Sequence, residues 1–190
     1  MSAPRIIEFS VSVLIAFIVL VALSFFSLRP ALTEFRGEAK SEWEEFFDQV
    51  RERNRLLPGL VEAIRGYESG HGKLTEKLLA ARAVSGTSTD PKRVIGAVNE
   101  IEALLKQVGK LLRMRPGLGR YPPFAGHWNK VVPLTARINL TRQSYNKSVR
   151  AYNHLLGIFP QSLTAAVFGF VPLDEYPTVP TVADSQGAPR

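Results

Sequence analysis

The chain has 190 residues, a net charge of +7 and a pI near 9.9, and it contains no cysteine. The lack of cysteine excludes disulfides, thiolate catalysis and thiolate-bound metal. No two of the histidines (His71, His127 and His154) stand at metal-ligand spacing. About 140 residues remain outside the apolar N-terminal run and the two ends, which is enough for one compact domain.

Residues 9–28, FSVSVLIAFIVLVALSFFSL, include no charged residue, no proline and no glycine. At about 1.5 Å per residue, a helix over this run spans the hydrocarbon core of a bilayer, which is about 30 Å thick. A helix also pairs its backbone amides internally, as lipid requires. We therefore predict a transmembrane helix at 9–28 after a short flank at 1–8. A buried core helix and a signal peptide cleaved near Ser24 are the alternatives.

The basic residues around this run predict its orientation. Arg29, Arg36 and Lys40 follow the run, whereas Arg5 precedes it. Cytoplasmic flanks carry the excess of Lys and Arg. We therefore expect a single-pass protein of the cell membrane, with its N-terminus outside and its larger domain in the cytoplasm. The opposite topology, which would suit an extracytoplasmic sensor or an envelope-assembly factor, is the alternative.

Apolar residues at intervals of three, four and seven predict two amphipathic helices after the apolar run, over residues 31–56 and about 60–84. The sequence Leu-Pro-Gly at 57–59 is expected to break or bend the chain between them, because an internal proline removes a helical hydrogen bond. Two glycines at 70 and 72 predict a local loosening of the second helix, and residues 85–89 read as a loop.

A third helix is predicted to begin after Asp90, which can cap its N-terminus, and to end near residue 112. The Pro- and Gly-rich stretch 116–126 is expected to be a linker that is not a continuous helix. A fourth helix is predicted from Trp128 or Pro133 to Phe159.

The C-terminal end divides into two parts. Residues 161–170 form a short apolar segment that either packs on the bundle or dips into the lipid headgroup region. From residue 171 to 190 the chain is rich in Pro, Thr and Ser without periodicity, which predicts a disordered tail. These elements together predict an all-α fold, in which an N-terminal transmembrane helix precedes an antiparallel bundle of about four long helices at 31–170.

Two stretches resemble the LemA family. Residues 53–82 are similar to the family's segment around Leu-Ile-Pro-Asn-Leu-Val, Gly-Tyr and Ala-Arg, and residues 137–170 follow its order of Arg-Ile, Arg-Gln, two Tyr-Asn pairs, Phe-Pro and Phe-Gly-Phe. A tryptophan upstream of the proline and an N-terminal anchor also belong to the family pattern. We expect a structural role for the positions that carry the resemblance, which are Trp43, Pro58, Tyr67, Arg82, Arg137, Arg142, Tyr145, Asn146, Tyr152, Asn153, Phe159, Pro160, Phe168, Gly169 and Phe170.

The chain departs from the family pattern at three places. Gly59 stands where the family has Asn, Gly70-His71 replaces His-Glu, and Thr135-Ala136 replaces Glu-Asn. The resemblance implies a membrane-anchored antiparallel bundle with a short extracytoplasmic N-terminus. It implies no particular reaction.

The sequence has no phosphate-binding glycine loop, no HExxH and no nucleophile elbow. We therefore expect a non-enzymatic scaffold or adaptor, without catalytic residues, cofactor, metal or small-molecule substrate. Its expected partners are the lipid bilayer and either another protein or a second copy of the chain, and we expect no nucleic acid. The alternative is a module that binds anionic lipid or an acidic partner through basic helix faces, with Lys106, Lys110, Arg113 and Arg115 as candidates.

Overall fold

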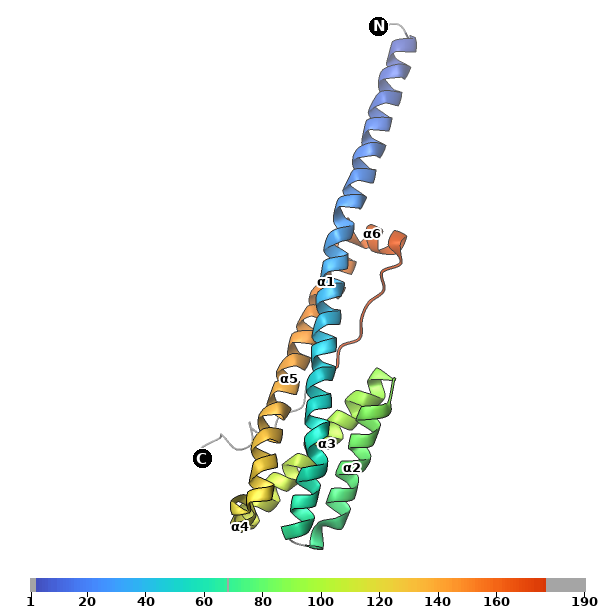
Figure 1. Cartoon of the computed structure of the whole chain (residues 1–190). Helices are drawn as coiled ribbons and strands as arrows, with labels where there is room; N and C mark the ends of the chain where they lie inside the picture. The colour runs from blue at the N-terminus through green and yellow to red at the C-terminus, as the bar shows by residue number, and fades with distance from the viewer. Residues whose placement is uncertain (1–2, 68, 177–190) are drawn as a thin grey trace. The chain divides into compact units, whose positions relative to one another are not determined.

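The computed structural model describes residues 3–67 and 69–176, without the side chains of residues 3–10, 17, 18, 21–28 and 69. All the regular elements in this part of the chain are helices, which confirms the all-α prediction (Figure 1). They are α1 (Ala3–Tyr67), the 3-10 helix η1 (Ser69–His71), α2 (Gly72–Thr87), α3 (Pro91–Met114), α4 (Pro116–Arg120), α5 (Pro122–Gly157) and α6 (Gln161–Phe168).

The predicted transmembrane segment at 9–28 lies within α1, but the side chains at 9, 10, 17, 18 and 21–28 are outside the described set. Among the residues that the structure describes, no helix combines the length and the apolar character needed to cross a bilayer.

Contacts divide the chain into two compact units. Unit 1 comprises Met1–Ser41 and Asn146–Glu175, and unit 2 comprises Glu42–Tyr145 and Tyr176–Arg190. Helices α1 and α5 each contribute to both units, because the boundaries fall inside them.

Unit 2 contains a bundle of helices that covers part of the predicted range 31–170. Within it, the C-terminal part of α1, then α2, α3 and the N-terminal part of α5 pack together, with short connections that make successive helices antiparallel (Figure 1). Their apolar stripes meet in a large core and in a smaller buried cluster around Phe46, Val98 and Ile138, as the helical periodicity predicts. The core includes Leu57, Leu60 and Ile64 of α1, Leu78 and Ala81 of α2, Ile101, Leu105 and Val108 of α3, Leu118 of α4, and Phe124 and Val131 of α5.

Pro58 does not break the helix, so of the two alternatives predicted for 57–59, a break or a bend, the break is wrong. Helix α1 continues to Tyr67, and the chain reverses around η1, where the glycines at 70 and 72 had predicted only a loosening. A proline at position 58 leaves the carbonyl of Asn54, four residues earlier, without its helical donor. Arg82 of α2 supplies the missing donor, because its Nε donates to Asn54 O at 2.7 Å. This contact gives a physical reason for an arginine at 82 in a chain with a proline at 58.

Replacing Arg82 with Met is expected to lower the free energy of unfolding by about 1–3 kcal/mol, because Asn54 O loses its donor in a largely buried place. In a Pro58→Ala background, residue 58 regains an N–H that can donate to Asn54 O. The same Arg82→Met change should then be less harmful. Urea unfolding of the four proteins gives the coupling, and equal losses in both backgrounds would contradict the assignment.

Helix α3 confirms the predicted third helix and its cap, since Asp90 Oδ1 accepts from Lys92 N at 3.0 Å. The expected linker at 116–126 is more helical than predicted. It contains α4 and the first turn of α5, and the helices are interrupted only around Arg115 and Tyr121. Prolines open both α4 and α5, and a first-turn proline loses no helical hydrogen bond.

Residues 171–175, which we expected to belong to a disordered tail, are held by hydrogen bonds to α5. In unit 1, the Asn153 amide donates to Leu173 O at 2.8 Å and accepts from Leu173 N at 2.9 Å. The Tyr152 hydroxyl donates to Val171 O at 3.0 Å. These side chains satisfy the extended backbone, which sequence periodicity alone does not reveal. The rest of the predicted tail, 177–190, lies outside the described residues.

Candidate functional site: a buried charge cluster

Three charged residues lie in the interior of unit 2, where charged side chains are rare. Arg53 of α1, Glu102 of α3 and Arg142 of α5 each have no measurable exposure. Each belongs to the apolar stripe of its helix. Arg53 lies between Val50 and Leu57 in one stripe, so the helix directs its side chain into the core.

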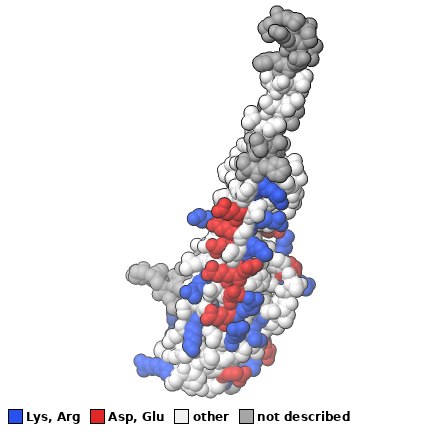
Figure 2. Space-filling view, turned by 45° about the horizontal axis from the view of Figure 1, so that its top comes forward, with Lys and Arg blue, Asp and Glu red and all other residues white. Residues whose placement is uncertain are grey.

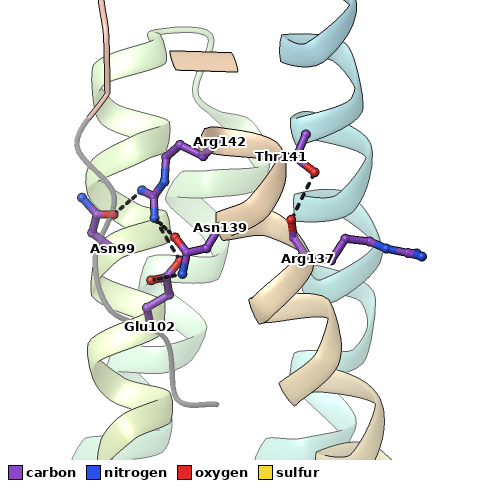
Figure 3. Close-up of polar contacts among 6 residues, drawn as sticks. All are labelled: Asn99, Glu102, Arg137, Asn139, Thr141 and Arg142. Carbon is purple, nitrogen blue, oxygen red and sulfur yellow. Dashed lines mark hydrogen bonds and ion pairs between the residues drawn. The ribbon is translucent and has the colours of Figure 1, made fainter. Parts of the chain in front are cut away.

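Arg142 makes hydrogen bonds to three side chains (Figure 3). Its Nη1 donates to Asn99 Oδ1 at 2.6 Å, its Nη2 donates to Glu102 Oε1 at 3.3 Å, and Nη2 also donates to Asn139 Oδ1. The Asn139 amide completes the network by donating to Glu102 Oε2 at 3.2 Å. Helices α3 and α5 are therefore joined by a connected set of polar contacts within the apolar core, although Arg142 Nε has no hydrogen-bond partner among the described residues.

Arg53 has a different environment, although it is equally buried. None of its three guanidinium nitrogens has a hydrogen-bond partner among the described residues. Its compensation is the Coulombic attraction of Glu102, which is opposed by the like charge of Arg142. The cluster thus holds two cations and one anion, and one of the cations lacks hydrogen bonds.

Burial governs the protonation of all three groups. Desolvation lowers the pKa of Arg53 from its usual value to about 10, against the opposing effect of Glu102. It likewise lowers the pKa of Arg142 and raises that of Glu102, whose two arginine neighbours act in the opposite direction. Because the folded protein holds the Arg53 proton less tightly than the unfolded chain, the penalty for this charge is fully present below pH 10.

Arg53→Met is expected to stabilise the protein. The lowering of the Arg53 pKa to about 10 corresponds to a penalty on the order of 3 kcal/mol for the buried charge. Methionine fills a similar volume without that penalty, so we expect a gain of about 1–3 kcal/mol in the free energy of unfolding at pH 7. Urea unfolding of the full chain in mild detergent measures it. A loss of stability would show that Arg53 has acceptors that the structure does not account for.

Several residues of the family motif lie outside this cluster. Trp43 stacks on Phe46 with ring centroids 5.2 Å apart, and its ring lies 5.0 Å from that of Tyr145. Arg137 is exposed and points away from Arg142 (Figure 3), with only its backbone carbonyl accepting from Thr141 at 3.1 Å.

The remaining motif positions have varied surroundings. Tyr67 is exposed and lies against Tyr121, with centroids 5.7 Å apart, and Asn146 is buried. Phe159 is exposed, whereas Phe170 is half-buried and its N donates to Ala165 O at 2.9 Å. Gly169 ends α6 in a left-handed conformation, with φ at 70°, which favours glycine.

Gly59, one of the departures from the family pattern, is explained by its neighbour. A Cβ at this position would fall on the imidazole ring of His127 of α5. Glycine therefore allows the His127 ring to lie directly against the backbone of α1. Thr135, at another departure, bonds within its own helix, where its hydroxyl donates to Val131 O at 2.8 Å.

The four predicted basic residues do not form one uniform surface. Lys110 and Arg113 are exposed on α3, whereas Lys106 is half-buried and close enough to Glu102 to lower its pKa. Arg115 lies beyond the end of α3 and lines a small hollow with Tyr67 and His71. On the face shown in Figure 2, Lys and Arg side chains are interspersed with Asp and Glu.

Sequence reasoning identified Arg142 as a motif residue but missed Arg53, Asn99 and Glu102. A charged residue within an apolar stripe is the sequence signal that could have indicated a buried charge. Arg53 lies within the seven-residue interval from Val50 to Leu57, and Arg142 lies within the seven-residue interval from Ile138 to Tyr145.

The comparisons with known proteins agree with the motifs. A family model, described as the LemA family, matches residues 42–189. No curated protein matches the chain. The matched residues include the whole large core, the buried charge cluster and the polar contacts of α5 with residues 171–175. The chain belongs to the LemA family.

Proposed function

We propose that the chain is a single-pass membrane protein whose helical domain acts as a non-enzymatic scaffold or adaptor at the membrane surface. The carrying observation is the uncharged run at 9–28, which is long enough for a bilayer. It belongs to the same helix, α1, that supplies one side of the bundle core.

The chemistry of the buried cluster favours a structural role over turnover. The charged atoms of Arg53, Glu102 and Arg142 are sealed from solvent, whereas a catalytic group needs access to a substrate. The hydrogen bonds of Arg142 and Asn139 are suited to fixing the register of α5 against α3. A fixed register gives the defined surface that a scaffold needs. We propose a protein partner, or a second copy of the chain, as the occupant of that surface.

Membrane attachment can be tested by placing charges in the run. Leu14→Arg together with Val19→Arg should move the full chain from the membrane to the soluble fraction, because each arginine near the middle of a span disfavours insertion by about 2.5–3.5 kcal/mol. The matched control is Met114→Arg with Leu140→Arg, two exposed apolar positions in unit 2, which should stay with the membrane. Flotation with lipid vesicles measures the membrane attachment of both double variants. A wild-type chain that does not float would contradict the proposal.

The topology follows the charge bias of Arg29, Arg36 and Lys40 after the run. We expect a C-terminal reporter that is active only in the cytoplasm to be active, and one that is active only outside to be silent. The reverse result would favour the extracytoplasmic sensor or assembly factor.

A further inference from the structure

The C-terminal helix α6 leaves an apolar face uncovered. Leu163 and Val167 are 47% and 71% exposed and lie one turn apart, and Phe159 just before the helix is 75% exposed. Thr164 and Ala165, on the other side of α6, are buried. The apolar face is thus turned away from the protein, and no Asp, Glu, Lys or Arg occurs from residue 151 to 173.

A contact between α6 and α1 shows which part of α1 lies next to this apolar face. The Arg29 guanidinium lies over the Phe168 ring, with its carbon 4.9 Å from the ring centroid. Both residues belong to unit 1. Arg29 is the first charged residue after the uncharged run at 9–28, so α6 is attached where the proposed membrane span ends. A guanidinium at the end of a span lies at the headgroup level, with its stem along apolar surface.

The length and direction of α6 suit the same location. Its eight residues extend only about 12 Å, which is too short to span the hydrocarbon core of a bilayer. In Figure 1, α6 runs across α1 rather than along it. A short helix that lies across a membrane span, at the level of its last apolar residues, presents its side to the headgroup boundary.

We propose that α6 is an interfacial helix, whose Leu163 and Val167 face inserts into the boundary between lipid headgroups and acyl chains. This inference rests on the proposed membrane attachment and adds a second contact with the bilayer. The occupant is lipid because α6 contacts Arg29, the residue that ends the uncharged run of the proposed span. Arg29 is then shared between the Phe168 ring and the anionic groups of the headgroups.

The absence of native cysteine allows a direct test with a single label. Val167→Cys, Val19→Cys and Thr87→Cys, at three exposed positions, are labelled with an environment-sensitive fluorophore in the full chain. Each is reconstituted in phosphatidylcholine vesicles whose lipids carry a doxyl quencher either near the headgroup or deep in the acyl chain. We expect the label at 167 to be quenched mainly by the shallow doxyl, the label at 19 mainly by the deep one, and the label at 87 by neither.

The three labels separate the possible failures. If the label at 19 is quenched but the label at 167 behaves like that at 87, the interfacial helix is contradicted and the anchor stands. If the label at 167 shifts to the blue without quenching by either lipid, protein rather than lipid covers α6, which also overturns the inference. If no label is quenched, the membrane attachment itself fails and the interfacial helix fails with it.

Discussion

Arg142→Met should lower the free energy of unfolding by about 3–5 kcal/mol, because it removes the central donor of a buried network. Arg142 is fully buried and donates to Asn99, Glu102 and Asn139. After the substitution, a carboxylate and two amide oxygens lose a charged donor in a place that water does not reach. Urea unfolding of the full chain in mild detergent, followed by circular dichroism, measures the loss.

Two matched substitutions make this result specific. Arg53→Met is the same chemical change in the same cluster, and it should stabilise rather than destabilise. Arg137→Met is the same change on the same helix at an exposed position, where an effect within about 0.5 kcal/mol is expected. If all three variants shift the urea midpoint alike, hydrogen bonding within the cluster does not explain the role of Arg142.

Much of the bundle could be predicted because its physical cause is local. Intervals of three, four and seven place apolar residues on one side of a helix, and that side is the one that α1, α3 and α5 bury. The cap at Asp90 is local as well, since it depends on one side chain and an amide two residues on.

The errors arose where distant residues decide the structure. Proline 58 normally opposes a helix, but Arg82, 24 residues further along, satisfies the carbonyl that the proline leaves unpaired. Likewise, residues 171–176 lack periodicity, yet Asn153 holds Leu173 through two hydrogen bonds across 20 residues. Local patterns carry no information on such partners.

The charge cluster was missed for a related reason. Most charged side chains lie at the protein surface, so residue type alone does not predict that Arg53 and Glu102 are buried. Their burial depends on each other and on Arg142, and these three residues come from three helices. In the sequence, one feature distinguishes Arg53 and Glu102 from surface charges, which is their position among the apolar residues of a helical stripe.

The members of the cluster should also be strongly coupled in their effects. Glu102→Leu alone is expected to lower the free energy of unfolding by about 3–5 kcal/mol, because Arg142 and the Asn139 amide lose their acceptor. If effects were additive, Glu102→Leu with Arg142→Met would lose about 6–10 kcal/mol. The two changes instead remove both ends of one interaction, so the loss should be well below that sum, and part of it comes from Arg53, which keeps its buried charge without Glu102.

The triple variant Arg53→Met, Glu102→Leu, Arg142→Met tests whether the whole cluster can be replaced by apolar side chains. It removes every charge from the cluster, including the unpaired cation, and leaves only the amides of Asn99 and Asn139 to be satisfied. We expect it to be within about 1–3 kcal/mol of the wild type, the penalty for unpaired buried amide groups. Urea unfolding of the single, double and triple variants gives the coupling energies. A triple variant that unfolds at the additive sum would mean that the three charges act independently, and that the network does not fix the register of the helices.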